Sequence, residues 1–208
     1  NINILFKNFD KILILFTIFC FIVLINGTNF IDGTNLNTIG YYIIVYSIIF
    51  YLSKEYNLDL EFIFHKKIIL FMLFLYVLNF LNKIQLGDSG SYLIGFFSAF
   101  YIIEFVNSNN LVSPYFAVLL LWYPCFENLF SILRKIYQKK SISSPDNLHL
   151  HHNIFLFLKI KSFKFPNNLT GLLINLINFL ILISGAIYFN STIQIILIIL
   201  ISITAYVI

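Results

Sequence analysis

The sequence has few charged residues: Lys, Arg, Asp and Glu make up 11% of its 208 residues, whereas hydrophobic residues make up 60%. A soluble globular domain carries roughly 25% charged residues, so that class is excluded. A disordered chain is excluded because it needs low hydrophobicity. Cys20 and Cys125 are too few for a disulfide scaffold, and both sit in apolar runs, so we expect them to face lipid or the core. What remains is an integral membrane protein with several spans.

Basic residues are also sparse, with 13 Lys and Arg against 9 Asp and Glu, for a net charge of +4. Arg134 is the single arginine. A nucleic-acid surface needs a concentrated basic face, which two-thirds of the chain lacks, so we expect no nucleic-acid partner. The sequence also has no initial Met and no polar residues after its last apolar run. We therefore expect a fragment of a single transmembrane domain, residues 1–208, that lacks an N-terminal part.

Long apolar runs predict an all-α bundle of about seven transmembrane helices, since a span needs about 20 mainly apolar residues. The predicted ranges are 4–25, 36–52, 66–82, 90–106, 113–133, 169–189 and 192–208. Pro124 lies in the fifth range and predicts a kink there, because proline removes a backbone hydrogen bond.

The charge of the connections predicts their side of the membrane. With seven spans, connections 26–35, 83–89 and 134–168 share one side, and the last of them carries seven basic residues and Asp146. The positive-inside rule places this side in the cytoplasm. The polar motifs of all three connections then face the cytoplasm together, which favours one shared site.

The first motif, Asn26-Gly-Thr-Asn-Phe-Ile-Asp-Gly-Thr-Asn35, repeats a polar residue every third position. At a helix end, Asn26, Asn29, Asp32 and Asn35 would share roughly one face. Amides with one carboxylate suit a ligand that both donates and accepts hydrogen bonds, such as a nucleobase or a sugar. The alternative is a helix cap and turn, for which Asn, Asp and Gly are common.

The second motif, Gly87-Asp88-Ser89-Gly90-Ser91, opens the fourth predicted helix. A helix N-terminus favours phosphate, and a carboxylate there can hold Mg²⁺ together with substrate phosphates. The alternative is that Asp88 or Ser89 caps the helix.

The third motif, Ser144-Pro-Asp-Asn-Leu-His-Leu-His-His152, holds three imidazoles within four residues. A metal cluster would need further ligands, and His65 is predicted on the other side, so phosphate contact in a basic loop fits better. A plain solvated loop is the alternative. Upstream, Glu127, Ser131 and Arg134 form a polar stripe along one predicted helix. An ionisable residue within a span indicates a functional role, and the alternative is a structural Glu127–Arg134 pair.

In order and spacing, these strings and Leu121-Trp-Tyr-Pro-Cys-Phe-Glu-Asn-Leu-Phe-Ser-Ile-Leu-Arg134 resemble the polyprenyl-phosphate N-acetylhexosamine-1-phosphate transferases. That family includes enzymes that initiate O-antigen and capsule synthesis in the bacterial inner membrane, and the muramyl-pentapeptide translocase. The resemblance implies transfer of a sugar-1-phosphate from a UDP-sugar to polyprenyl (undecaprenyl) phosphate, with release of UMP. It also implies a cytoplasm-facing site, Mg²⁺ as cofactor, and a possible homodimer in the lipid bilayer.

The resemblance implies roles for particular residues. It makes Asp88 the metal ligand, and places Asn29 near the diphosphate and Asn35 near the uracil. Asp32 would line the nucleotide site, and Arg134 would contact phosphate with the histidines. The predicted catalytic residues are therefore Asp32, Asp88, His149, His151 and His152. The predicted substrate-binding residues are Asn26, Asn29, Asn35, Lys83, Gly87 and Arg134.

The sequence departs from the family pattern at three points. It has no Asp-Asp pair, whereas the family carries one on an earlier cytoplasmic loop. Leu36 stands where the family usually has Gly, and Gln85 where an aromatic residue often stacks on uracil. The missing pair predicts that this chain alone is not a complete enzyme. The alternatives are a multi-span transporter or channel, which would place ionisable residues near mid-membrane, and an inactive truncated remnant.

Overall fold

The computed structural model describes residues 2–141 and 148–207, and over these ranges the chain is all-helical. Nine α-helices and one short 3₁₀ helix, η1 (Ile31–Gly33), occur there, without a β-strand. The helices are α1 (Ile2–Phe30), α2 (Asn37–Tyr56), α3 (Phe62–Phe80), α4 (Gly87–Ser108), α5 (Pro114–Leu120), α6 (Trp122–Tyr137), α7 (Leu150–Ile160), α8 (Pro166–Ile187) and α9 (Thr192–Val207). The prediction of an all-α membrane bundle is confirmed.

Each of the seven predicted spans falls on helix, but the predicted loop at 134–168 also contains helix, because α6 runs on to Tyr137 and α7 follows. In the described residues, four helices are long and apolar enough to cross a membrane, or five if α5 and α6 form one bent span. That is fewer than the seven predicted. The apolar helix α9 has only 16 residues, and α2 is rich in tyrosine.

Helix α2 is the best-buried helix of the bundle, and its tyrosines bond to neighbouring helices. The Tyr42 hydroxyl lies 2.7 Å from the Thr28 hydroxyl of α1, and the Tyr46 hydroxyl lies 3.1 Å from Ser98 Oγ of α4. Lipid tails are as apolar as leucine, so interhelical hydrogen bonds and close packing hold helices together where the hydrophobic effect does not. The tyrosines that lower the hydropathy of α2 therefore attach it to its neighbours.

The bend in the fifth predicted span falls at Leu121, three residues before Pro124, with 69° between α5 and α6. Proline has no N–H, so it leaves the carbonyl four residues earlier without its helical donor. That carbonyl belongs to Leu120, the last residue of α5, and it accepts a hydrogen bond from the Tyr41 hydroxyl at 3.0 Å. The predicted kink is confirmed, with its hinge one turn earlier than Pro124.

Small residues allow the helices that carry the polar motifs to approach closely. A Cβ at Gly27 of α1 would lie 2.0 Å from the Pro124 carbonyl oxygen of α6. A Cβ at Gly171 of α8 would lie 2.1 Å from the Asn35 carbonyl oxygen. These contacts set α1 against α6, and α8 against the residues at the start of α2.

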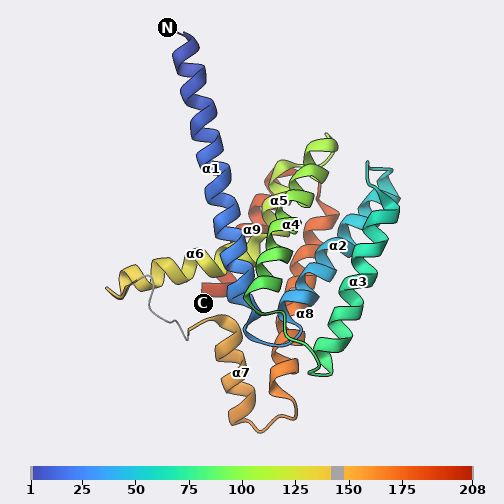
Figure 1. The fold of residues 1–208 in the computed structure, drawn as a ribbon, viewed down its shortest axis with the longest axis vertical. Helices are drawn as coiled ribbons and strands as arrows, with labels where there is room; N and C mark the ends of the chain where they lie inside the picture. Colours follow the sequence, from blue (N-terminus) through green and yellow to red (C-terminus); the bar gives the residue numbers. More distant parts are fainter. Residues whose placement is uncertain (1, 142–147, 208) are drawn as a thin grey trace.

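Figure 1 shows the consequence for the polar motifs. The α1–α2 and α3–α4 connections and α7 lie at the same end of the bundle, shown at the bottom, whereas the N-terminal part of α1 projects beyond the opposite end. We call the lower end the site end. The predicted parity of these connections is confirmed.

Candidate functional site

A polar cavity of about 310 Å³ opens at the site end, and both predicted carboxylates line it. We call it the Asp cavity. Its lining comes from η1 and its flanks, from the ends of α3 and α8, and from the start of α4: Asn29, Asp32, Gly33, Thr34, Asn35, Asn79, Gln85, Leu86, Gly87, Asp88 and Asn167.

Asp32 and Asp88 reach the cavity from different turns of the chain. Asp32 interrupts helical geometry inside η1, with φ −80° and ψ 15°, and is half-buried. Asp88 lies in the first turn of α4, which begins at Gly87 without a side-chain cap, so neither Asp88 nor Ser89 caps this helix. The Asp32 carboxylate interacts with the backbone of Gly87 and is close enough to Asp88 for the two charges to repel.

This repulsion matters because the lining of the Asp cavity contains no Lys or Arg side chain. Because no basic side chain in the lining neutralises the two carboxylates, a bound cation would stabilise them. Mg²⁺ typically takes one or two carboxylates and completes its shell with water and substrate phosphates. Among the described residues, no group of three or more His, Cys, Asp or Glu side chains could hold a metal alone. The donor set therefore fits a cation shared with a phosphorylated ligand.

Asparagine side chains build one wall of the Asp cavity. Asn35 Nδ2 donates to Asn82 Oδ1 at 2.6 Å and to Asn168 Oδ1 at 2.9 Å. Its backbone N–H donates to Asn167 Oδ1 at 3.1 Å. Asn79 and Asn167 are cavity residues that the sequence motifs did not single out. The sequence did carry a signal for these two residues. A side-chain amide at the end of an apolar helix is costly to bury unless it is hydrogen-bonded or functional.

Leu36, where the resemblance led us to expect glycine, adopts a left-handed backbone with φ 68° and ψ −17°. Its N–H donates to Asn79 Oδ1 at 2.6 Å, and its carbonyl accepts from Asn175 Nδ2 at 2.8 Å. A left-handed leucine is unfavourable by roughly 1–2 kcal/mol, and these side chains hold it in place. Glycine adopts a left-handed backbone without steric cost, which explains why the family usually has glycine at this position.

Asn29 projects from the last turn of α1 toward α4. Its Oδ1 accepts from Ser91 Oγ at 2.8 Å, and its Nδ2 donates to the Tyr92 hydroxyl at 3.3 Å. Gln85, at the position where the family often has an aromatic residue, lines the Asp cavity itself. This departure therefore lies within the candidate site.

A second cavity of about 310 Å³ adjoins the first and shares Gly33, Thr34 and Asn167 with it. We call it the His cavity, because His151, His152 and Phe155 of α7 complete its lining. A Cβ at Gly33 would lie 2.0 Å from His151 Nε2, so glycine there lets the imidazole reach the turn that carries Asp32.

His151 is uncharged at neutral pH. Its side chain is buried, and burial is the first cause that lowers its pKa to about 4, helped by the neighbouring His149 and His152 and opposed by Glu127. In the described chain, neither His151 Nδ1 nor Thr34 Oγ1, both buried beside this cavity, has a hydrogen-bond partner. Buried polar atoms without partners are uncommon, so they indicate places where a ligand or water bonds.

His149 does not line either cavity but stacks behind His151, with ring centroids 5.6 Å apart and planes 6° apart. Its Nδ1 lies 2.9 Å from Glu127 Oε1. Glu127 therefore has a partner other than the Arg134 that the structural alternative named.

Three predicted binding residues lie outside the lining of both cavities. Asn26 Nδ2 bonds to the Ile22 carbonyl of its own helix at 2.8 Å. Lys83 is exposed in the α3–α4 connection. The Arg134 guanidinium lies over the Phe130 ring, 5.3 Å from its centroid. Their assignment to substrate binding stays a prediction. Of the third motif, residues 144–147 lie outside the described ranges.

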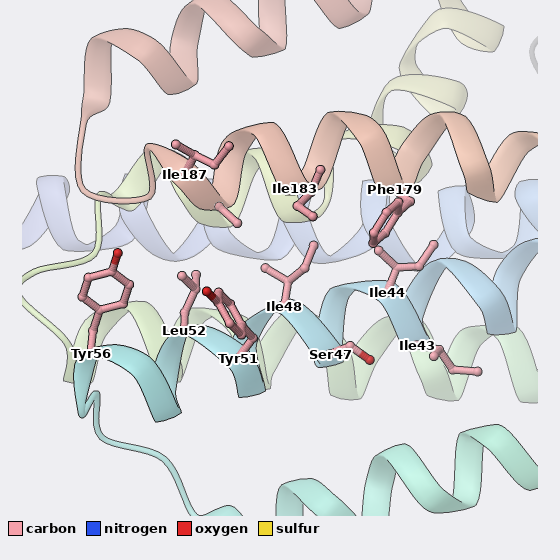
Figure 2. A pocket seen from close by; sticks show the side chains of 11 residues that line it. Ile43, Ile44, Ser47, Ile48, Tyr51, Leu52, Tyr56, Phe179, Ile183 and Ile187 are labelled. Carbon is pink, nitrogen blue, oxygen red and sulfur yellow. The ribbon is translucent and has the colours of Figure 1, made fainter.

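Other cavities lie away from these motifs. One, of about 590 Å³, is an apolar groove between α2 and α8, lined by residues such as Ile44, Ile48 and Ile183 (Figure 2). Another, of about 390 Å³, lies at the end of the bundle opposite the site end and includes Asp59, Glu61 and Glu104. We call it the distal cavity. Glu104 thus lies in a different cavity from Asp88.

A multi-span helical membrane protein with two carboxylates and an imidazole cluster at one end is the class that this fold and site define. More particularly, residues 2–106 match the profile of Glycosyl transferase family 4, and the chain belongs to that family. The match contains Asp32 and Asp88 and ends before His149, His151 and His152.

Two curated bacterial proteins are similar to parts of this chain. A probable undecaprenyl-phosphate N-acetylglucosaminyl 1-phosphate transferase of Bacillus subtilis (strain 168) is 32% identical over 112 residues, 53% of this chain and 30% of that protein. An undecaprenyl-phosphate alpha-N-acetylglucosaminyl 1-phosphate transferase of Thermotoga maritima is 37% identical over 71 residues, 34% of this chain and 23% of that protein. Each match thus spans less than a third of the relative's length. No solved structure matches the chain significantly.

Proposed function

We propose that this chain contributes the site of a sugar-1-phosphate transferase. The reaction moves an N-acetylhexosamine-1-phosphate, of the N-acetylglucosamine type, from a UDP-sugar to polyprenyl phosphate. A phosphate oxygen of the lipid attacks the sugar-bound β-phosphorus, the bond from that phosphorus to the bridging oxygen breaks, and UMP leaves. The protein would act in the bacterial inner membrane with its site toward the cytoplasm, and initiate a cell-surface glycan.

The observation that carries the proposal is the pair of carboxylates, Asp32 and Asp88, in one amide-lined cavity at a membrane face. Phosphoryl transfer depends mostly on positioning and charge neutralisation, with little covalent chemistry from the protein. Family membership and the names of both relatives support the same chemistry.

In this proposal, Asp88 and Asp32 are the residues that would hold Mg²⁺ at the nucleotide site. When bound, the metal would neutralise phosphate charge and make UMP a better leaving group. Asn29 and Asn35 bond the nucleotide diphosphate and the uracil. His151 is uncharged at neutral pH, so it would offer a hydrogen bond to the substrate and no positive charge.

The transporter or channel alternative would need ionisable groups along a path near the middle of the membrane. Tyrosines of the buried helix α2 instead bond to hydroxyl groups of neighbouring helices, Tyr42 to Thr28 and Tyr46 to Ser98. Asp32 and Asp88, whose cavity lining contains no basic side chain, lie instead at a membrane face. This position favours an enzyme that acts at the membrane surface.

The test is UMP release in membranes that contain the chain together with any upstream sequence of its reading frame. We expect release only with UDP-N-acetylhexosamine, polyprenyl phosphate and Mg²⁺ all present, and loss of release on chelation. Release that does not require the lipid phosphate would refute the proposal, and so would its complete absence under all these conditions.

The 208 residues by themselves are expected to be inactive in the same assay. The chain has no Asp-Asp pair, and the resemblance assigns such a pair to the metal and the lipid phosphate. Saturable, metal-dependent UMP release by the 208 residues alone would show that Asp32 and Asp88 suffice.

A further inference from the structure

Glu127 of α6 is a buried carboxylate that has three hydrogen-bond partners within the described ranges, from two other segments. It is 1% exposed. Its Oε1 lies 2.9 Å from His149 Nδ1 and accepts from the backbone N–H of Leu150 at 3.4 Å. Its Oε2 accepts from the Tyr206 hydroxyl of α9. A buried carboxylate is tolerated only when paired and bonded in this way.

The contact with Glu127 fixes which nitrogen of His149 carries a hydrogen. An ionised carboxylate only accepts hydrogen bonds, so Nδ1 must be the donor. Whenever the ring is neutral, its Nε2 atom is then left as an acceptor. A carboxylate behind a histidine commonly sets both the tautomer and the ring orientation.

The same carboxylate also fixes the start of α7. His149 is the N-cap residue of α7 and makes no capping bond itself, whereas Leu150 is the first residue of the helix. Glu127 thus supplies, from another helix, an acceptor for an N–H at the α7 N-terminus, where negative charge is favourable. His151 is the next residue of α7, and its ring stacks on the His149 ring. By fixing His149 and the start of α7, Glu127 also influences where the His151 ring lies in the His cavity.

Tyr206 holds the other side of Glu127. Its ring packs against Phe126 and Phe130 of α6, with centroids 5.0 and 5.6 Å away. These ring contacts do not involve the hydroxyl, so replacing Tyr206 with Phe removes one hydrogen bond and leaves the packing.

We propose that Glu127 and Tyr206 are positioning residues that orient the His149 and His151 imidazoles at the His cavity. The proposal rests on the proposed function for what the imidazoles do, but its structural content can be tested without turnover. No substrate contact is assigned to either residue. They act through His149.

The first experiment measures the His149 tautomer by ¹⁵N NMR of histidine-labelled chain in lipid nanodiscs. The chain has four histidines, so their ring signals can be assigned by substituting each in turn. We expect wild-type His149 to carry its hydrogen on Nδ1. Glu127→Gln offers one carbonyl oxygen to three donors and adds its own N–H donors, so we expect the His149 ring signals to change.

The second experiment measures the steady-state kinetics of UMP release in membranes that contain the chain with any upstream sequence of its reading frame. We expect Tyr206→Phe to lower kcat about 10-fold and Glu127→Gln about 10–100-fold, the range found when partners behind a site's ligands are removed. The KM for the UDP-sugar should change by less than about 3-fold, since neither residue is assigned to its binding. Loss of fold alone would instead lower the amount of active protein, which titration of active sites detects.

Tyr46→Phe is the matched control. Tyr46 is a buried tyrosine whose hydroxyl bonds to Ser98 of α4, and it lines neither site-end cavity. We expect its kcat to stay within 2-fold of wild type.

Two results would overturn the positioning role: His149 signals that do not change in Glu127→Gln, or a kcat for Tyr206→Phe equal to that of Tyr46→Phe. If the preparation releases no UMP at all, the proposed function fails. The NMR result then still decides whether Glu127 sets the His149 tautomer.

Discussion

Two cavities at opposite ends of the bundle contain carboxylates, yet they are built differently. The Asp cavity brings Asp32 and Asp88 together with amides from α1, α3 and α8. The distal cavity brings together Asp59, Glu61 and Glu104, all of them exposed. Carboxylates alone therefore do not mark a site. What distinguishes the Asp cavity is a shell of bonded asparagines around a half-buried carboxylate.

The histidines repeat this contrast. His65, near the distal cavity, is buried with both ring nitrogens engaged, Nδ1 by the Tyr101 hydroxyl and Nε2 by the Tyr46 carbonyl oxygen at 2.7 Å. His151, at the site end, is buried with a ring nitrogen that lacks a partner in the described chain. A fully bonded buried histidine serves the fold, whereas an unsatisfied one indicates a ligand.

The largest expected effect distinguishes the carboxylates of the Asp cavity from those of the distal cavity. Asp88→Asn should lower the rate of UMP release about 10³-fold, because it removes a charge that the reaction needs at the diphosphate. Glu104→Gln should leave the rate within 2-fold. Both variants should melt within a few degrees of wild type in detergent, and equal rates for the two would refute the assignment of the site to one end.

A methyl group added at each end should sharpen the difference. A Cβ at Gly33 would lie 2.0 Å from His151 Nε2, and a Cβ at Gly185 of α8 would lie 2.0 Å from a terminal methyl of Leu119. The stacked His151 ring cannot yield as a leucine methyl can, so Gly33→Ala should lower kcat about 10²-fold. Gly185→Ala should instead destabilise by roughly 1–3 kcal/mol and keep its kcat. Similar kcat values for both would contradict the role of Gly33.

The stability of the fold in acid tests the environment of His151. Its folded pKa of about 4 lies below the ordinary value of 6.5, so the unfolded chain binds this proton more readily. Stability should therefore fall as the pH drops from about 6.5 to 4, with a slope of at most about 1.4 kcal/mol per pH unit from this group. His151→Gln should flatten that dependence in denaturation curves measured at several pH values. An unchanged slope would show that His151 titrates normally.

The smallest expected effect concerns backbone strain at each end. Gly87, at the start of α4, has φ 61°, and Asn57, after α2, has φ 49°. Gly87→Ala should destabilise by about 1 kcal/mol, and Asn57→Gly should stabilise by a few tenths, because glycine adopts this conformation without steric cost. Thermal melts of both variants check the signs, and a stabilising Gly87→Ala would be inconsistent with the backbone described here.

Much of the site could be predicted from the sequence because its motifs are local. Asp32 and Asp88 each sit in a short polar string at the end of an apolar run, and the parity of the spans puts both strings on one side. Asn79 and Asn167 could not be assigned in the same way. Each is a single amide near a helix end, and only packing of α3 and α8 around Asn35 brings them to the cavity.

The sequence by itself determined the membrane class, the helical fold and the clustering of polar motifs at one end. Hydropathy and loop charge act locally along the chain, so they can be read without coordinates. Tertiary structure decided how those motifs meet. Gly33 allows His151 to approach the turn that carries Asp32, and Glu127 joins α6 to α7 and α9. These contacts depend on the distance between segments far apart in sequence, which helix packing sets.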